Sequence, residues 1–184
     1  MMAVYSGGQT GVDICALRAA HRLGMRTGGF APAGFMTCAG PNPELGALYG
    51  LQELRAGPDA YPARSRANVD AADAVLALRP RPSLGTDLTI TYACRGVWAR
   101  DPLAHTQAGA GVAVLVEGNV PTLVITTFQP RFATLVSHIH SFLWRRRPGV
   151  LNVCGPRECD EAFVERLLYC AFAPFAAMQK KVHS

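Results

Sequence analysis

Short apolar runs alternate along the chain with longer segments in which apolar residues recur every three or four positions. A continuous apolar run favours a strand, and a period near 3.6 favours a helix. The runs predict strands over residues 2–6, 26–30, 73–78, 121–127 and 150–154. The periodic segments predict helices over residues 11–23, 63–72, 86–97, 130–147 and 160–172. Strands that alternate with helices predict an α/β fold of three layers, in which helices flank a mostly parallel central sheet.

Glycine and proline interrupt this alternation. Residues 31–60 are rich in both, and because a long loop inside a domain is often functional, this stretch is a candidate wall or lid of a ligand site. The apolar residues 112–116 predict an extra strand or one arm of a hairpin. Residues 178–184 read as a polar tail. A length of 184 residues is enough for a substantial core, so we expect a single domain over residues 1–184.

The composition narrows the choice of partner. Hydrophobic residues make up 49% of the chain and charged residues 17%, which excludes disorder as the main state. The formal net charge of +5 suits an anionic ligand without singling out nucleic acid. The clearest basic run, Arg145-Arg146-Arg147, ends a predicted helix, where cations meet the helix dipole favourably. No nucleic-acid motif accompanies it, so nucleic acid is not expected as a partner.

The cysteines are scattered along the chain. They are Cys15, Cys38, Cys94, Cys154, Cys159 and Cys170. None of them forms a pair or a cluster with zinc-ligand spacing, so we expect no metal bound by the protein itself. No signal peptide precedes the first strand and no apolar run reaches about 18 residues, so no membrane contact is expected. These features predict a soluble, cytoplasmic protein with free thiols.

The Gly-rich segment Ser6-Gly-Gly-Gln-Thr-Gly-Val-Asp13 joins the first predicted strand to the first predicted helix. A Rossmann-type fold binds phosphate at such a place, because free backbone N–H groups and the positive end of the helix dipole attract anions. The glycine spacing matches neither the P-loop nor the dinucleotide fingerprint. A second interpretation, which can hold together with the first, is a tight turn with a capping box between Thr10 and Asp13. The candidate ligand-binding residues of this loop are Gly7, Gly8, Gln9, Thr10 and Gly11.

Two later loops follow predicted strands in the same way. One holds Gly85 and Thr86, and the other runs from Gly155 to Glu158. The carboxyl ends of parallel strands meet at one edge of a sheet, so the helix N-termini that follow these loops would point at a shared crevice. Together they predict a phosphate-binding site.

Four blocks of the sequence carry a family resemblance. They are Ser6–Asp13, Thr27-Gly-Gly-Phe30 running into Pro32-Ala-Gly34, Arg64-x-x-x-Asn68-Val69 with Asp73 and Gly85-Thr-x-Leu-Thr89, and Leu151-Asn-Val-Cys-Gly-Pro-Arg-Glu158. In this order the chain resembles the molybdenum cofactor carrier family of the Rossmann-like SLOG superfamily of nucleotide-ligand-binding domains. The resemblance implies a binding protein for the molybdenum–pterin cofactor, whose pterin carries a phosphate, or for a nucleotide. It also implies site roles for Arg64, Asn68, Asn152, Arg157 and Glu158.

The chain departs from that family at three places. Ala33 stands where the family usually has lysine, which removes one point-charge contact to an anion. Ile14 stands where arginine often follows the motif aspartate. Residues 97–119 resemble an insertion relative to the family. The edge of the sheet, or an oligomer surface, is therefore where this chain could differ from the family.

Two other functions remain open. The superfamily includes hydrolases of the nucleotide N-glycosidic bond, a reaction that needs a carboxylate. The available acids are Asp13, Glu53, Asp87 and Glu158, but the glutamate that the phosphoribohydrolase branch carries after its Gly-Thr loop is absent here. The third candidate is an interaction module without ligand, and a homo-oligomer is expected in any case.

Overall fold

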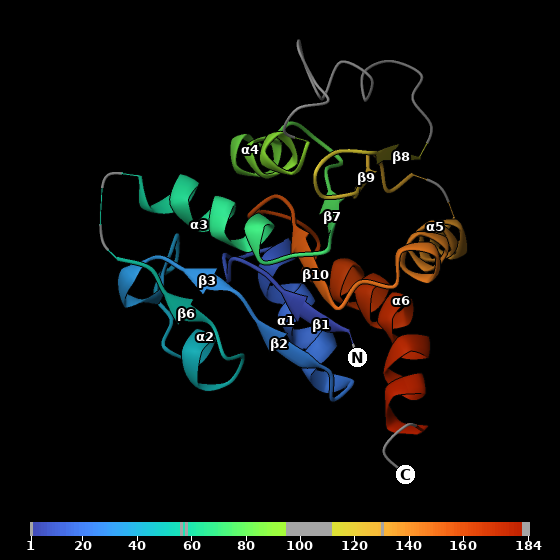
Figure 1. The fold of residues 1–184 in the computed structure, drawn as a ribbon, viewed down its shortest axis with the longest axis horizontal. Coiled ribbons are helices and arrows are strands. Elements are labelled where there is room, and N and C mark those ends of the chain that lie inside the picture. Colours follow the sequence, from blue (N-terminus) through green and yellow to red (C-terminus); the bar gives the residue numbers. More distant parts are fainter. Residues whose placement is uncertain (1, 56, 58, 95–111, 130, 182–184) are drawn as a thin grey trace.

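A computed structural model describes residues 2–55, 57, 59–94, 112–129 and 131–181. Within these residues, the central sheet has six strands in the order β2-β1-β10-β7-β9-β8 (Figure 1). Their bounds are β1 Ala3–Tyr5, β2 Arg26–Gly28, β7 Ala74–Leu78, β8 Ala113–Val116, β9 Thr122–Ile125 and β10 Val150–Cys154. Strand β8 pairs with β9 in antiparallel orientation, and the other neighbours pair in parallel. The α/β class with a mostly parallel sheet is therefore confirmed.

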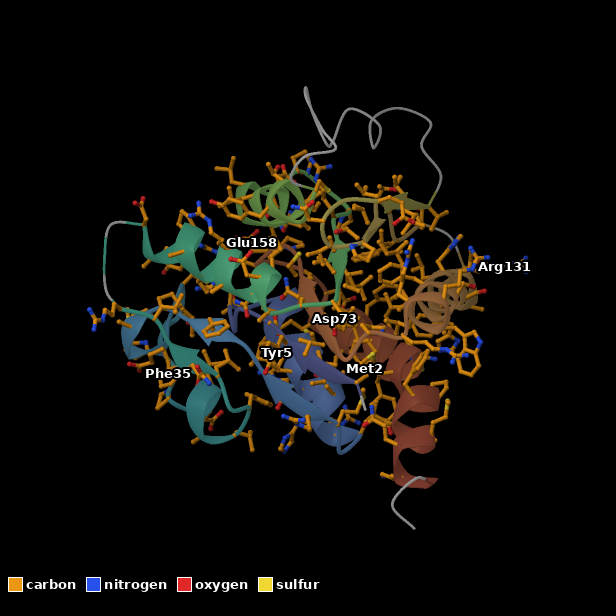
Figure 2. All side chains as sticks on the ribbon, viewed as in Figure 1. Met2, Tyr5, Phe35, Asp73, Arg131 and Glu158 are labelled. Carbon is orange, nitrogen blue, oxygen red and sulfur yellow. The ribbon has the colours of Figure 1, made fainter. Side chains whose placement is uncertain are left out.

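Helices cover both faces of this sheet. They are α1 Val12–Arg22, α3 Ala60–Asp70, α4 Leu84–Ala93, α5 Phe132–Arg146 and α6 Glu161–Lys181. Helix α6 packs on α1 and α5 on one face, and α3 packs on α4 on the other (Figure 1). Side chains fill the space between the sheet and both helical layers (Figure 2). The result is the expected arrangement of three layers.

Strand β7 shows how the sequence forms this core. Its residues alternate between the two faces of the sheet, as the geometry of a strand requires. Leu76 and Leu78 belong to the cluster that contains residues of α1, α5 and α6. Val75 and Ala77 belong to the cluster that contains residues of α3 and α4. Both faces are buried, which is why this strand reads as a continuous apolar run.

The strand order has a simple explanation in connectivity. Placed before β1, strand β10 becomes the first strand, and the five parallel strands then run 3-2-1-4-5 across the sheet. That is the order of Rossmann folds, in which ligands bind where the strand order reverses. Here the reversal lies between β10 and β7.

The irregular stretch 31–60 contains only short elements in its described part. They are β3 Phe30–Ala31, the 3₁₀ turn η1 Ala33–Phe35, β4 Met36–Thr37, β5 Gly40–Pro41, α2 Glu44–Ala47 and β6 Gln52–Glu53. Within residues 112–116, Ala113–Val116 form the edge strand β8. It pairs with the next strand, β9, in antiparallel orientation, so it is both an extra strand and one arm of a hairpin, as expected. Most of the predicted insertion, residues 97–111, lies outside the described residues.

Three predicted helix boundaries were wrong. Helix α3 begins at Ala60, three residues before the predicted start. Helix α4 begins at Leu84, so Thr86 lies in its first turn and not at its start. Helix α6 continues beyond residue 172 to Lys181, through Pro174. Proline has no N–H to donate to the carbonyl four residues earlier, and the ring nitrogen Nε2 of His140 lies 3.3 Å from that carbonyl oxygen, on Cys170. This contact from α5 explains how the helix tolerates its proline.

Candidate functional site

A cavity of about 610 Å³ opens at the carboxyl edge of the sheet, where the strand order reverses. The loop after β10 and the loop after β7 form two of its walls, and the first turn of α4 continues the second of them. The first turns of α3 and the loop after β1 complete it. Glu158 lies on this side of the sheet, near α3 and α4 (Figure 2). The three loops that the sequence singles out therefore contribute to one cavity.

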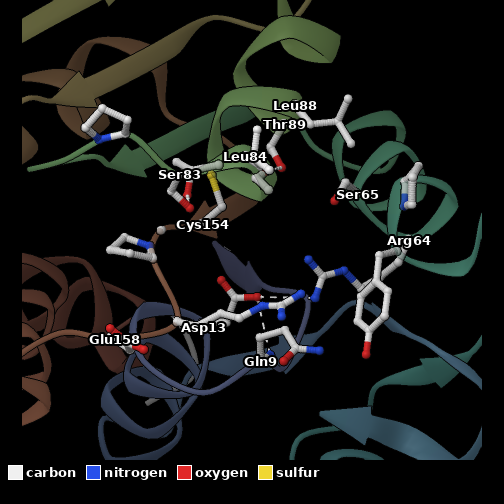
Figure 3. A pocket seen from close by; sticks show the side chains of 18 of the residues that line it. Gln9, Asp13, Arg64, Ser65, Ser83, Leu84, Leu88, Thr89, Cys154 and Glu158 are labelled. Atoms are coloured by element: carbon white, nitrogen blue, oxygen red, sulfur yellow. Dashed lines mark hydrogen bonds and ion pairs between the residues drawn. The ribbon is translucent and has the colours of Figure 1, made fainter. Parts of the chain in front are cut away.

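A buried ion pair forms one side of the cavity. Helix α3 supplies Arg64 and the first turn of α1 supplies Asp13, with 3.6 Å between Nη1 and Oδ2. Their side chains are 11% and 5% exposed, respectively. In Figure 3, Gln9, Asp13 and Arg64 meet on one side of the cavity, opposite Ser83, Thr89 and Cys154.

Burial raises the pKa of the Asp13 carboxyl, because the charged form loses its hydration. The Arg64 guanidinium opposes this rise, as do hydrogen bonds from the amides of Gln9 and Gly155. Asp13 thus ties the loop after β1 to the loop after β10.

The Arg64 guanidinium lies directly on the backbone of the Gly-rich loop. Its Nη1 donates to the Gly7 carbonyl at 3.2 Å, and a Cβ at Gly7 would lie 2.5 Å from its Cζ. Among the described residues, its Nε is the one buried side-chain nitrogen or oxygen without a hydrogen-bond partner. A buried, unpaired donor on a cation costs free energy unless an acceptor reaches it, so this wall of the cavity is suited to an anion.

The chain's own acceptors occupy three amides of the Gly-rich loop. Gln9 donates to Asp13 Oδ2 at 3.3 Å, Gly11 donates to Glu161 Oε1 at 3.3 Å, and Val12 donates to the Pro156 carbonyl at 3.2 Å. Helix α1 begins at Val12 with Gly11 as its N-cap and has no side-chain cap. The predicted capping box between Thr10 and Asp13 was therefore wrong, since Asp13 bonds to Gln9 instead.

The first turn of α4 is the second helix terminus at the cavity. Ser83 is its N-cap, but no side chain caps its backbone. The first amides of a helix have no acceptor within the helix, and Ser83, Leu84, Gly85 and Thr86 all line the cavity. A Cβ at Gly85 would meet no atom within 4 Å. This terminus is thus open to a ligand in a way that the Gly-rich loop is not.

Charged and aromatic side chains form the rim. Arg81 pairs with Glu158 at 3.2 Å across the two strand-end loops. Arg157 lies over the Tyr61 ring, with 5.2 Å between Cζ and the ring centroid. Among the described residues, three arginines and two carboxylates line the cavity, and each carboxylate already has an arginine partner.

The sequence model of the circularly permutated YpsA SLOG family matches residues 4–175. The chain belongs to this family. The description agrees with the sheet, whose strands regain the Rossmann order when β10 is placed first. The predicted SLOG membership is confirmed.

A crystal structure from Syntrophus aciditrophicus SB, named "Putative molybdenum carrier protein", has the same fold. The TM-score is 0.66 at 24% sequence identity, and the match covers 94% of this chain and 93% of that one. A search of curated proteins gave no match.

Eight of the sequence-predicted residues of this SLOG chain come together at the cavity. They are Gln9, Asp13, Arg64, Gly85, Thr86, Gly155, Arg157 and Glu158. Gly8 and Thr10 line a separate cavity of about 250 Å³ instead. Asn68 hydrogen-bonds the backbone of Phe30 and donates to the Arg64 carbonyl at 3.1 Å, so it acts on the site through α3.

Three other predicted residues have different surroundings. Asn152 is buried within β10. The carboxylate of Asp87 forms an ion pair with Arg79 at 2.5 Å. Glu53 is exposed in the short strand β6.

The sequence analysis missed Tyr61 and Arg81 as lining residues. Arg81 follows the buried strand β7 within Arg79-Pro-Arg-Pro82, and its place at a strand's carboxyl end was the available signal. Tyr61 has no comparable signal, because no predicted strand ends directly before its helix.

The described residues also bear on metal binding and on membrane-spanning helices. They contain no group of three or more His, Cys, Asp or Glu side chains that could hold a metal ion. No helix among them is both long and apolar enough to cross a membrane.

Proposed function

We propose that this SLOG protein binds a small phosphate-bearing molecule in the 610 Å³ cavity. The phosphate sits at the first turn of α4, and Arg157 and Arg64 supply positive charge. The observation that carries the proposal is the unpartnered, buried Arg64 Nε on one side of the cavity and, on the other, a helix terminus without a side-chain cap. Backbone amides at such a terminus favour a negative ligand.

The proposed ligand class is a molybdenum–pterin cofactor or a nucleotide. The protein of the matching crystal structure is named "Putative molybdenum carrier protein", and the phosphate of either molecule suits the donor set of Arg64, Arg157 and the α4 amides. The metal would arrive already held by its pterin. The protein's own residues would bind the phosphate and shield it from solvent, while the pterin–metal group supplies any redox chemistry.

Stabilisation by ligands tests this function. Purified protein is titrated with inorganic phosphate, nucleoside monophosphates and molybdenum–pterin cofactor, and the thermal unfolding midpoint is recorded. A ligand at a hundred times its dissociation constant should stabilise the native state by about 2.7 kcal/mol. The Arg157→Met variant should lose this shift, and Arg166→Met, which changes an exposed arginine on α6 away from the cavity, should keep it. If no phosphate-bearing compound raises the midpoint, the proposal fails.

A second candidate is hydrolysis of a nucleotide N-glycosidic bond. It is favoured by the cavity position of Asp13, whose pKa is raised by burial, because an acid of this kind can donate a proton to a leaving base. Asp87 is less suited, because it is not among the residues that line the cavity and its carboxylate lies against Arg79. Release of free base from nucleoside monophosphates would support this candidate, and its loss in Asp13→Asn but not in Asp87→Asn would identify the acid.

Replacing Gly85 with alanine should separate binding from folding. The new Cβ meets no atom of the chain, and alanine favours a helix over glycine by up to about 1 kcal/mol. We therefore expect a slightly higher unfolding free energy in urea. The same methyl group enters the first turn of α4 at the cavity, so the apparent affinity for the ligand should fall about tenfold, which corresponds to about 1.4 kcal/mol. The ligand-induced thermal shift should become smaller for the same reason. Unchanged affinity would place the phosphate elsewhere.

A further inference from the structure

Two exposed apolar side chains mark one part of the cavity wall. Tyr61 of α3 is 40% exposed, and Leu84 of α4 is 93% exposed, which makes it the most exposed large apolar residue in the described part of the chain. Both side chains line the 610 Å³ cavity. Ligand sites are mostly lined by apolar and aromatic side chains that a bound molecule covers. A phosphate group accounts for the arginines and the α4 amides of the cavity, but not for these two side chains.

The first two turns of two neighbouring helices form this part of the cavity, which we call the apolar wall. Its members all line the cavity, and they are Tyr61 and Pro62 of α3 and Leu84 and Leu88 of α4. Leu84 and Leu88 are four residues apart, so they share one face of α4. Figure 3 shows both of them on the side of the cavity that α4 forms. Because α3 packs on α4, an aromatic side chain from one helix and aliphatic side chains from the other bound the same space.

The apolar wall adjoins the proposed phosphate site on both helices. Arg64 lies three residues after Tyr61 on α3, and residues at this spacing share one face of a helix. Their separation along the helix axis is about 4.5 Å, from a rise of 1.5 Å per residue. Leu84 is the first residue of α4, in the turn whose amides bind the phosphate in the proposed function. The part of a ligand next to its phosphate therefore meets the apolar wall.

Tyr61 already stacks with a planar group of the chain. The Arg157 guanidinium lies over its ring, with 5.2 Å between Cζ and the ring centroid. A guanidinium is planar and delocalised and stacks on aromatic faces, and the bases of nucleic acids stack on aromatic side chains in the same way. The Tyr61 ring thus has a face that accepts a flat partner.

We propose, on the basis of the phosphate site proposed above, that the apolar wall binds a flat heteroaromatic ring carried by the same ligand. The ligand class is then a phosphate ester that contains such a ring, and not a sugar phosphate or free phosphate. The ring stacks on Tyr61 and contacts Leu84 and Leu88 of the facing helix. Arg157 turns from Tyr61 to the phosphate and leaves the tyrosine ring to the ligand.

The chemistry of the wall argues against two other ligand shapes. Among its four side chains only Tyr61 carries a polar atom, so the hydroxyl groups of a second sugar would lose water without gaining partners, which costs free energy. An acyl chain needs burial on all sides, whereas the exposure of Leu84 leaves the wall open to water. A flat ring satisfies both conditions, because its faces cover apolar side chains while its polar edges remain hydrated.

Calorimetric titration with matched ligands tests the proposal. The ligands are inorganic phosphate, ribose 5-phosphate, adenosine monophosphate and neopterin monophosphate. Adenosine monophosphate and ribose 5-phosphate share the sugar and the phosphate and differ in the adenine base. We expect at least one of the two ring-bearing ligands to bind about tenfold or more tightly than ribose 5-phosphate, as stacking of one ring on an aromatic side chain supports. Whichever of the two binds more tightly assigns the ring as a purine or a pterin.

Two variants of the wall and one matched control place the effect. Tyr61→Leu removes the aromatic face but keeps an apolar side chain, and Leu84→Asn makes an exposed position polar. Each should weaken binding of the preferred ring-bearing ligand about fivefold or more and leave the dissociation constant of ribose 5-phosphate unchanged. Leu48→Asn changes a leucine that is 45% exposed and does not line the cavity, so it should leave both constants unchanged.

The outcomes separate this inference from the proposed function. If ribose 5-phosphate binds as tightly as both ring-bearing ligands, the ring site is overturned while the phosphate site stands. The ring site is also overturned if neither Tyr61→Leu nor Leu84→Asn weakens the ring-bearing ligand. If none of the four ligands binds, the proposed function and the ring site fail together.

Discussion

Replacing Arg64 with methionine should lower the free energy of unfolding by about 3–5 kcal/mol, because it leaves a buried carboxylate without its charged partner. Asp13 is 5% exposed, and Arg64 is the cation paired with it in the described part of the chain. Methionine keeps much of the side-chain volume, so the loss reports the missing charge rather than an empty space. Urea unfolding at neutral pH measures the effect.

The pH dependence identifies the cause of this loss. Burial already raises the pKa of Asp13, and removal of Arg64 removes the largest opposing influence. A carboxyl with a raised pKa in the folded state takes up its proton more readily folded than unfolded. The deficit of Arg64→Met should therefore be largest at neutral pH and shrink as the pH falls through the folded pKa of Asp13 toward the unfolded value of about 3.9.

The double variant Asp13→Asn with Arg64→Met serves as the control. It has no carboxylate to leave unpaired, so it should recover part of the lost stability and lose the extra pH dependence. It also provides a folded protein in which the contribution of Arg64 to phosphate binding can be measured. A deficit in Arg64→Met that is equally large at pH 5 and pH 7 would contradict this account.

Local sequence patterns predicted most of the helices and strands. The strands and the helix order follow from periodicity, which neighbouring residues alone determine. Which strands lie side by side does not follow, because pairing joins distant segments such as β1 and β10. The permuted order, and with it the position of the cavity between β10 and β7, therefore required the structure.

The site was predictable at the level of loops and not of individual contacts. The three strand-end loops converge as expected, but the amide of Gly11 is occupied by Glu161, 150 residues away. Arg64 is likewise paired with an acid from another helix. The predicted end of α6 was wrong for a related reason. A proline ordinarily ends or kinks a helix, but here the ring of His140 from α5 lies against the carbonyl that Pro174 leaves without its helical N–H donor.

Replacing Gly11 with alanine should lower the free energy of unfolding by more than about 4 kcal/mol. Gly11 has φ 76° and ψ −130°, a combination that residues with a Cβ avoid. A Cβ there would lie 2.4 Å from the Pro156 carbonyl oxygen and 2.5 Å from that of Arg157. Because both obstacles are backbone atoms, the loop after β10 must move.

Gly34→Ala separates this clash from backbone strain. Gly34 has φ 70°, and a Cβ there would find its nearest neighbour, Met36 Cγ, at 3.7 Å. Alanine at that position should cost only about 1–2 kcal/mol, the ordinary penalty for a left-handed residue. Thermal and urea unfolding of both variants measure the difference. Equal losses would mean that strain alone explains Gly11.

Gly11→Ala also links the stability of the fold to ligand binding, through the contact between Gly11 and the loop after β10. The loop that Gly11→Ala displaces carries Arg157 and Glu158, which line the cavity. Any Gly11→Ala protein that folds at low temperature should therefore lose the phosphate-induced shift, whereas Gly34→Ala should retain it. Retained binding in Gly11→Ala would contradict this link between the loop after β10 and the phosphate site.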